Sequence, residues 1–450
     1  MRPPTIIQLS RQVVRLHSAR CMSQCTALQF DDHRTVFRHK STWELLRALL
    51  VLRACGSDLL VDNCLQLLRT GQRLLGERGL GWLLRPTVYA QFVAGQEEQS
   101  LASVAGELQA HGIRLMVAPT LEEDVGEGTS RQKKYDSNLE ELLQLADMAQ
   151  RHGGTRPCLQ TKITALLSAD TLRNLSQVYT SSGKPCASFI ETVAGSLMGR
   201  TSLPDIVGLS RADRENLLLA LARLSKLGRE ASTQGLRLLV DAEYSYVNPG
   251  CSLITMAMMA AFNQQRPVVS NTFQCYFKRA LDSLSQEIAL AEQLGVCFGA
   301  KIVRGAYLEK ERQIDPSTTC ASYEDTGHNY HRVLDRALEH AQKTGSRSLL
   351  IVATHNEEAV SYATQRLKEL NVDPKAGHIV FAQIYGMAEQ ISMPLVHAGY
   401  LVYKSVPMGP LYQVLPYLAR RVAENRSVLH GARKERQLLQ QELWWRLTKA

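Results

Sequence analysis

Short apolar runs alternate with longer helical patterns along most of the chain after Gly112. Each run is rich in Val, Ile and Leu, and the stretches between runs carry apolar residues at helical spacing. Strands that alternate with helices form parallel βα units, and eight such units close a (β/α)8 barrel. The pattern therefore predicts an α/β protein built on a distorted, TIM-like barrel. Its eight strands are expected to begin near Ile113, Cys158, Leu236, Pro267, Phe298, Ser348, His378 and Tyr400.

Residues 41–108 show helical periods only, with Ser41 or Thr42 as the first N-cap and Pro86 as a break between later helices. We expect this stretch to form an accessory helical region. The barrel domain is expected to occupy residues 109–429, and a basic tail follows at 430–450. The long connection between the second and third runs is also helical in pattern, which indicates an insertion.

The helix expected after the last run carries Arg420 and Arg421. Adjacent residues lie about 100° apart around a helix, so the two guanidinium groups can bracket one anion, each offering a planar fork to a carboxylate. Glu424 is close enough along the helix to orient either arginine. The alternative is a solvated helix face with an ion pair of little energetic weight.

Polar residues follow most of the predicted strands. In a (β/α)8 barrel the reactive groups lie at the carboxyl ends of the strands, so these residues are expected to share one mouth. The last run, 400–403, is expected to end in two of them before a Pro/Gly turn. The set consists of Lys162, Asp241, Gln274, Lys301, Arg304, His355, Gln383, Lys404 and Ser405.

Charge narrows the choice of ligand for this mouth. The 450-residue chain has a formal net charge of +9, which suits an anionic ligand, an anionic membrane surface or nucleic acid. Nucleic acid ranks last because no basic run is interleaved with aromatic residues and no finger spacing occurs. In the mouth, Asp241 is the main counter-charge, which points to an anionic cofactor, an anionic substrate or both. The cations expected around it are Lys162, Lys301, Arg304, Lys404, Arg420 and Arg421.

The sequence predicts neither a metal site nor a Rossmann dinucleotide site. His355 has no second histidine or carboxylate at ligand spacing, and no GxGxxG motif follows a predicted strand. The ten cysteines include no CxxC pair, so neither a zinc site nor a disulfide framework is expected.

The two ends of the chain suggest a location. Residues 1–30 carry four arginines, hydroxyl residues and interleaved apolar residues but no acid, as a mitochondrial transit segment does. The alternative is an unspecialised basic tail. No apolar run approaches the roughly 20 residues of a spanning helix, so no segment is expected to cross a membrane. The tail at 430–450 combines basic residues with Trp444 and Trp445, and it either touches an anionic membrane or packs as a helix on its own domain.

Six ordered motifs resemble the proline dehydrogenase family. They run in one uninterrupted order between Leu108 and Ser427, and the set is specific although any one member would be weak. The motifs are DAEYS from Asp241, FQCYFKR from Phe273, KIVRGAYLEKE from Lys301, ATHN from Ala353, FAQIYGM from Phe381 and YKSVPMGPLYQVLPYLARRVAEN from Tyr403.

The resemblance implies a barrel that binds FAD, with the helix after the last strand lying over the barrel mouth. Members of the family oxidise a cyclic secondary amine that carries a carboxylate. Hydride leaves the ring carbon beside the nitrogen for flavin N5, which gives a cyclic imine, and the electrons pass on to a membrane quinone.

The resemblance also implies roles for single residues. Arg420 and Arg421 would clamp the substrate carboxylate with Lys162 beside them, while Tyr307, Tyr417 and Ile384 would wall the substrate ring. Lys162, Asp241, Lys301 and Tyr307 are the expected catalytic residues. Residues near the flavin would be Asp241, Gln274, Lys301, Val303, Arg304, Gly305, Thr354, His355, Gln383, Lys404 and Glu424.

Three positions qualify the resemblance. Lys301 stands where bacterial members have arginine near flavin N5, so the charge is kept and the bidentate fork is lost. Glu122 aligns loosely with a gating glutamate. Ser405 stands where most of the family has a tyrosine that packs against the substrate ring, and a serine there leaves space and a hydroxyl for a ring hydroxyl group.

We therefore expect oxidation of trans-4-hydroxy-L-proline to a hydroxylated 1-pyrroline-5-carboxylate. Space alone discriminates weakly, by about a hundredfold, so three alternatives stay open. The chain acts on L-proline if Ser405 is a neutral change. The second alternative is a catalytically silent flavin-binding barrel. The third is a barrel aldolase in which Lys301 forms a Schiff base with the substrate.

Overall fold

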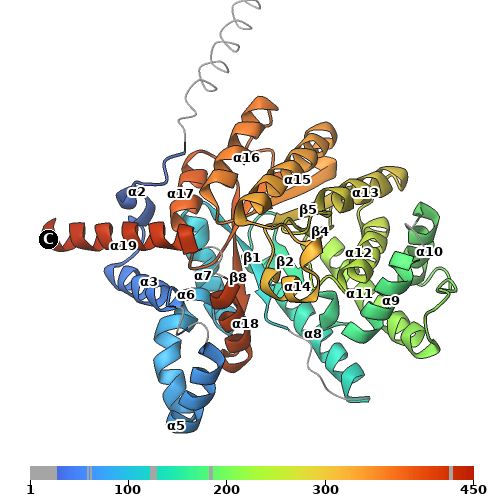
Figure 1. Ribbon diagram of the computed structural model, residues 1–450, viewed down its shortest axis with the longest axis horizontal. Helices are drawn as coiled ribbons and strands as arrows, with labels where there is room; N and C mark the ends of the chain where they lie inside the picture. The colour runs from blue at the N-terminus through green and yellow to red at the C-terminus, as the bar shows by residue number, and fades with distance from the viewer. Residues whose placement is uncertain are drawn as a thin grey trace, which may run out of the picture.

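The computed structural model describes residues 28–57, 60, 63–121, 129–181, 186–424 and 429–449. Its centre is a closed barrel of eight parallel strands that pair in chain order, with the last strand pairing back to the first (Figure 1). The predicted (β/α)8 barrel is confirmed. The strands are β1 (Ile113–Pro119), β2 (Cys158–Thr161), β3 (Arg237–Val240), β4 (Val269–Gln274), β5 (Phe298–Val303), β6 (Ser348–Ala353), β7 (Ile379–Ile384) and β8 (Val402–Met408).

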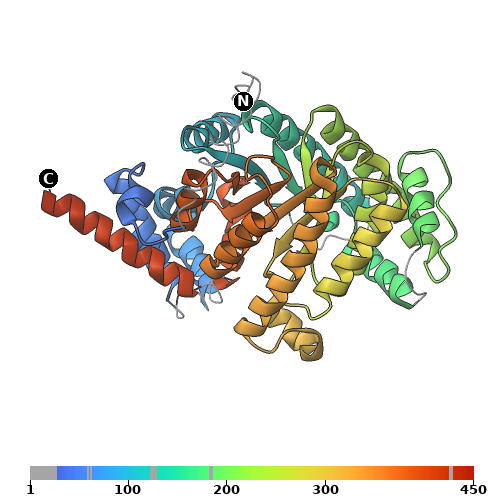
Figure 2. The ribbon, with the colours of Figure 1, turned by 90° about the horizontal axis from the view of Figure 1, so that it is seen from above.

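Helices surround the strands on the outside of the barrel (Figure 2). The long connection between β2 and β3 contains α9 (Ala169–Ser181), α10 (Ala187–Leu197) and α11 (Arg211–Thr233), so its predicted helical character is confirmed. The remaining helices of the barrel are α8 (Thr129–His152), α12 (Asn248–Phe262), α13 (Ala280–Gln293), α14 (Leu308–Ile314), α15 (Tyr323–Thr344), α16 (Glu357–Glu369), α17 (Glu389–His397) and α18 (Leu411–Glu424).

The barrel interior below the mouth is packed with apolar side chains. Successive residues of a strand point to opposite faces, so every second residue of each strand faces this interior. Met116 of β1 lies in register with Cys158 of β2 on one side and with Ser405 of β8 on the other. The interior cluster consists of Met116, Cys158, Leu239, Leu349, Ile351, Val380, Ala382 and Tyr403.

Strand β8 is longer than the sequence pattern predicted. The expected end at Tyr403 is wrong, because β8 stays paired with β1 as far as Met408 and only then reaches the turn at Gly409. Lys404 and Ser405 are therefore residues of the strand and not of the loop after it. Since Tyr403 faces the barrel interior, Ser405 faces the same way and Lys404 points outward.

The helical region before the barrel consists of α2 (His33–Phe37), α3 (Thr42–Cys55), α5 (Cys64–Leu84), a π-helical turn (Arg85–Tyr89), α6 (Ala90–Phe92) and α7 (Glu98–Ala110). Ser41 caps α3 through a capping box with Glu44, as the sequence suggested. Helix α5 is a hairpin of two segments, because Gly76 has φ of 65° and ψ of 173° within it. The segments pack closely enough that a Cβ on Gly71 would lie 3.2 Å from Leu80 Cδ1. This hairpin projects from the body of the molecule (Figure 1).

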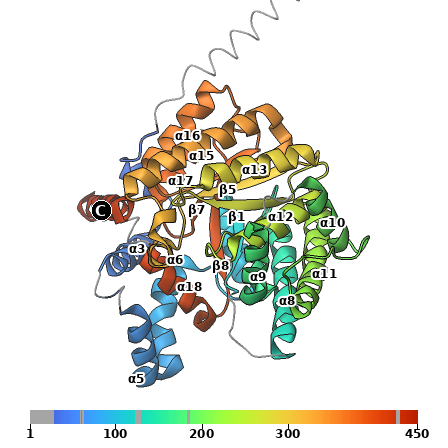
Figure 3. The same cartoon turned by 45° about the vertical axis from the view of Figure 1, so that its right-hand side comes forward.

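The basic tail forms one helix, α19 (Leu429–Lys449), that packs on α2 and α3 (Figure 3). Arg446 donates hydrogen bonds to the carbonyl oxygens of Lys40, at 2.8 Å, and Phe37, at 3.0 Å. Nearer its start, the Glu435 carboxylate accepts the backbone N–H groups of Ala388, at 3.0 Å, and Glu389, at 3.2 Å. The helix is thus attached to the first turn of α17 as well as to the N-terminal helices.

A buried charge cluster lies between β8, α17 and α19. The Lys404 ammonium is fully buried and lies 3.4 Å from Glu389 Oε1. Burial lowers the pKa of Lys404, and Glu389 and Glu435 act against this. Burial alone would raise the pKa of Glu389, but Lys404 and Lys40 hold it below its usual value. Burial raises the pKa of the Glu435 carboxyl to about 7.

We predict that Glu435→Gln flattens part of the pH dependence of stability. The folded-state pKa of about 7 lies above the ordinary value of 4.5, so the folded chain binds a proton that the unfolded chain releases between these pH values. The free energy of unfolding of the wild type should therefore fall as pH rises through this window, by about 1.4 kcal/mol per pH unit. Urea unfolding across the window measures the slope. Glu339→Gln, at an exposed site on α15, is the control. Equal slopes in wild type and Glu435→Gln would contradict the prediction.

We predict that Gly305→Ala destabilises the fold more than Gly295→Ala. Both glycines have positive φ, of 118° and 67°. A Cβ on Gly305 would lie 1.9 Å from Cε1 of the buried Tyr276, whereas one on Gly295 would meet nothing within 4 Å. In the control, the free energy of unfolding should fall only by the cost of backbone strain, about 1 kcal/mol. In Gly305→Ala it should fall by that amount and also by the cost of displacing Tyr276. Urea midpoints compare the two variants, and equal losses would show that Tyr276 yields without cost.

Candidate active site

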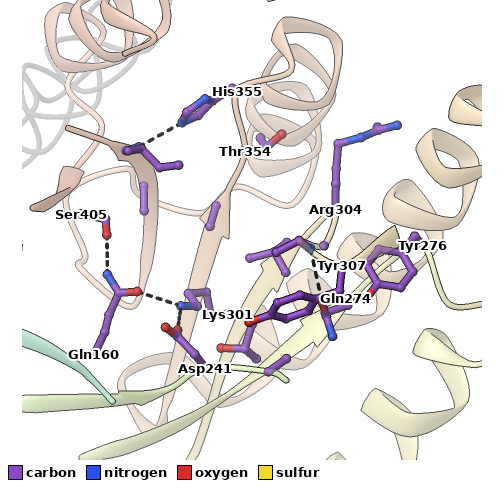
Figure 4. Close-up of a pocket in the computed structure, with 18 of the residues that line it drawn as sticks. Gln160, Asp241, Gln274, Tyr276, Lys301, Arg304, Tyr307, Thr354, His355 and Ser405 are labelled. Carbon is purple, nitrogen blue, oxygen red and sulfur yellow. Dashed lines mark hydrogen bonds and ion pairs between the residues drawn. The ribbon is translucent and has the colours of Figure 1, made fainter. Parts of the chain in front are cut away.

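A cavity of about 680 Å³ opens at the carboxyl ends of the barrel strands (Figure 4). Residues within or directly after each of the eight strands line it. The predicted common mouth therefore exists as one cavity. The predicted site residues that line it are Lys162, Asp241, Gln274, Lys301, Val303, Arg304, Gly305, Tyr307, Thr354, His355, Gln383, Ile384 and Ser405.

An ion pair between Lys301 and Asp241 lies at the base of this cavity (Figure 4). Lys301 belongs to β5 and is only 6% exposed, so its ammonium needs a counter-charge to remain ionised inside the barrel. Asp241 directly follows β3, and its backbone N–H donates to Thr161 O at 2.8 Å. The pair thus places a fixed positive charge and a fixed negative charge at the cavity floor.

Gln160 extends this pair to the other side of the barrel, and sequence reasoning missed it. It lies inside β2 and is 8% exposed. Lys301 Nζ lies 3.4 Å from Gln160 Oε1, and Gln160 Nε2 donates to Ser405 Oγ at 2.6 Å. The only signal in the sequence is one amide residue inside the run from Cys158, two residues before Lys162.

Tyrosines form one wall of the site. Tyr307 lies at the start of α14, and its ring centre is 4.4 Å from that of Tyr244, which in turn stacks on Tyr246 at 5.5 Å. Tyr276 donates its hydroxyl to Gln274 Oε1 at 3.0 Å, and Gln274 Nε2 donates to Glu243 O at 2.9 Å. Tyr244, Tyr246 and Tyr276 had no predicted role, although Tyr244 and Tyr276 belong to the motifs quoted above and Tyr246 directly follows one of them.

The opposite side carries the polar groups that follow β6 and β7. His355 Nε2 accepts the backbone N–H of Ile384 at 2.9 Å, so in the neutral ring the proton is assigned to Nδ1. Gln383 accepts a hydrogen bond from Ser392 Oγ at 2.9 Å. Its amide nitrogen is buried and has no partner among the described residues, but the side chain points to the outside of the barrel, because Gln383 alternates with Ala382 of the interior cluster and is in register with Lys404. Thr354 directly follows β6 and lines the cavity beside His355 (Figure 4).

Two further cations contribute to the positive potential of the cavity. Arg304 stacks on Tyr323 with its guanidinium carbon 3.9 Å from the ring centre, and it donates to Tyr323 O at 2.7 Å. Lys162 follows β2 and lies near the buried Glu243. Burial raises the pKa of Glu243, and the charge of Lys162 acts against this rise. Both cations lie where an anionic ligand in the cavity would meet them.

Lys404 does not line the cavity, so its predicted contact with a cofactor is not supported by its position. Its side chain points to the outside of the barrel and pairs with Glu389, because it alternates with Ser405 on β8. Tyr417, Arg420, Arg421 and Glu424 belong to α18, but nothing is described of their side chains. Glu122 and residues 1–27 lie outside the described part of the chain. The roles expected of these residues stay predictions.

No group of three or more His, Cys, Asp or Glu side chains among the described residues is arranged to hold a metal ion. None of the helices described is both long enough and apolar enough to span a membrane.

The sequence matches known proteins over almost its whole length. Residues 102–434 match the family described as "Proline dehydrogenase". The chain is 41% identical over 437 residues to hydroxyproline dehydrogenase of Xenopus laevis, covering 96% of this chain and 93% of that protein. It is 40% identical to the rat protein of the same name, covering 93% and 94%. Human "Proline dehydrogenase 1, mitochondrial" is 31% identical over 543 residues, covering 94% of this chain and 90% of that protein.

Solved structures share the fold. Proline utilization A of Bdellovibrio bacteriovorus superposes with a TM-score of 0.59 at 17% identity, covering 94% of this chain and 42% of that longer protein. The Bradyrhizobium japonicum protein gives 0.56 at 18% identity, covering 87% and 41%. At this identity the likeness concerns the fold alone. The resemblance drawn from the six motifs is confirmed by the sequence matches, and the chain belongs to the proline dehydrogenase family.

Proposed function

We propose that this chain oxidises trans-4-hydroxy-L-proline to a hydroxylated 1-pyrroline-5-carboxylate with FAD as its redox cofactor. The observation that carries the proposal is the place of Ser405, whose hydroxyl lines the cavity and is held there by Gln160. The names and higher identities of the hydroxyproline dehydrogenases support the hydroxylated substrate over L-proline.

The cavity residues fit a flavin. Gly305 lines the cavity, and because it has no side chain the loop after β5 lies directly against the buried ring of Tyr276, which lines the cavity too. Lys301, Arg304 and Lys162 provide the positive charge that an anionic cofactor requires. The volume is that of an ordinary small-molecule site. When bound, FAD would supply the acceptor for the hydride of the substrate.

The chain's own residues would bind and orient the substrate. Lys162, with Arg420 and Arg421 from α18, would hold the carboxylate by charge-assisted hydrogen bonds. Tyr307, fixed by Tyr244, would limit the movement of the ring. Binding at two points turns the encounter of substrate and cofactor into a reaction within one complex, which is where a protein assists hydride transfer most.

We predict that Ser405→Tyr shifts selectivity from trans-4-hydroxy-L-proline toward L-proline. A phenol at this position fills the space next to the ring and removes the small hydroxyl. The ratio of kcat/KM for the two substrates should change by about tenfold to a hundredfold in favour of L-proline, the range that added volume gives in such pockets. Steady-state turnover with a soluble quinone acceptor measures it. Ser405→Ala, which removes the hydroxyl without adding volume, separates the two effects.

Other outcomes select the alternatives. A wild type that prefers L-proline is an ordinary proline dehydrogenase. A yellow protein that turns over neither substrate is a silent flavin-binding barrel. A colourless protein whose Lys301 is trapped by borohydride in the presence of an aldehyde substrate is an aldolase.

We also propose a mitochondrial location, with electrons leaving for a membrane quinone and the chain resting on an anionic membrane. The acid-poor residues 1–30 and the name of the human relative, "Proline dehydrogenase 1, mitochondrial", support the location. Exposed apolar side chains support the contact, because Leu74 is 79% exposed at the tip of the α5 hairpin between Arg73 and Arg78. The hairpin joins α18 through a hydrogen bond from Tyr412 to Glu77 O, so it lies beside the helix that follows β8.

We predict that Leu74→Glu combined with Leu75→Glu weakens binding to vesicles of phosphatidylcholine and phosphatidylserine. Apolar insertion and attraction of the flanking arginines both stabilise such contacts, and glutamates oppose both. The bound fraction in co-sedimentation should fall severalfold. Val207→Glu, at an 84% exposed site between α10 and α11, is the matched control. If the control and the test variant bind equally, the hairpin is not the membrane surface. A loss confined to Trp444→Ala would assign the contact to α19.

A further inference from the structure

The position of Lys301 determines which way the Gln160 amide faces. A lysine ammonium only donates hydrogen bonds, so the atom of Gln160 that faces Lys301 Nζ at 3.4 Å must be the carbonyl oxygen. The amide nitrogen is then left to face Ser405 Oγ at 2.6 Å. The ion pair with Asp241 keeps Lys301 in place. The charge of Lys301 therefore orients the amide, because a flipped amide would place its NH2 group against the ammonium.

This orientation sets the polarity of the Ser405 hydroxyl. Its oxygen accepts the hydrogen bond from Gln160, so its own proton cannot point toward Gln160. Among the described residues no acceptor for that proton is present, and Ser405 lines the cavity. The hydroxyl proton is thus available to a group bound in the cavity (Figure 4).

We infer that Gln160 is a positioning residue for substrate selection, which holds Ser405 as a hydrogen-bond donor toward a hydroxyl oxygen on the substrate ring. The inference rests on the proposed function, since it assigns Ser405 to the ring hydroxyl of hydroxyproline. Gln160 itself need not touch the substrate. Its effect passes through Ser405 and distinguishes a ring with a hydroxyl from one without.

The reversal of polarity provides the sharpest test. In Gln160→Glu a carboxylate of nearly the same shape still accepts from Lys301, but it accepts from Ser405 too and turns the serine proton away from the cavity. The ratio of kcat/KM for trans-4-hydroxy-L-proline to that for L-proline should fall by about threefold to tenfold, as expected for one uncharged hydrogen bond. Gln160→Met, which removes both polar atoms, should lower the ratio less, because Ser405 then rotates freely.

A double-mutant cycle shows whether the effect passes through Ser405. In a Ser405→Ala background Gln160→Glu should leave the ratio unchanged, because no hydroxyl remains to orient. An effect on the cofactor through Lys301 would change both substrates alike and leave the ratio unchanged. Each ratio comes from one preparation, so the fraction of active protein cancels. Thr161→Val is the matched control, since it removes a hydroxyl that has no partner among the described residues from the next position of β2, facing away from the cavity.

The outcomes separate this inference from the proposed function. If the wild type prefers L-proline, the proposed function fails whatever Gln160 does. If the wild type prefers the hydroxylated substrate but Gln160→Glu keeps the wild-type ratio, the inference fails alone. A further fall of the ratio by Gln160→Glu in the Ser405→Ala background also overturns it, because the effect would then not pass through Ser405.

Discussion

The structure of the site depends on how the barrel accommodates one buried ammonium. Lys301 lies almost without solvent at the cavity floor, where an unpaired charge would be very costly. Asp241, directly after β3, forms an ion pair with it. The ammonium also faces the carbonyl oxygen of Gln160 on β2, and the amide nitrogen of Gln160 donates to Ser405 on β8. One desolvated cation on β5 thus orders three polar groups, at the end of β3 and within β2 and β8, and their orientations are not independent of each other.

A second buried lysine shows the same constraint on the other face of the sheet. Lys404 is adjacent in sequence to the cavity residue Ser405, but it points outward and is satisfied by Glu389, near Glu435 of α19. The alternation of side chains along β8 separates the two roles. The front of the strand therefore faces the ligand, while its back attaches the C-terminal helix.

Most of the fold was predictable from the sequence, because most strands are largely apolar runs with turn signals and each motif begins within or directly after such a run. The site was predictable where a polar residue ends a strand, as at Asp241 and His355. Lys404 was misplaced because Lys, Ser and Pro after an apolar run look like a strand end, although pairing with β1 continues. Gln160 was missed because β2 and β8 lie on either side of β1 only once the barrel has closed, and local pattern carries no information on closure. The clamp expected of Arg420 and Arg421 on the substrate carboxylate stays a prediction.

The attachment of α19 has a mechanical consequence for α18. Helix α18 follows the paired strand β8 on one side, and on the other side the chain continues into α19, which is held by Glu435 and Arg446. A helix tethered at both ends cannot peel away from one end as a free terminus does. Any opening of this segment is restricted to a swing or a slide about two fixed points, and a C-terminal truncation that removes α19 would leave α18 held only by β8, by its own buried apolar face and by the hydrogen bond from Tyr412 to Glu77 O.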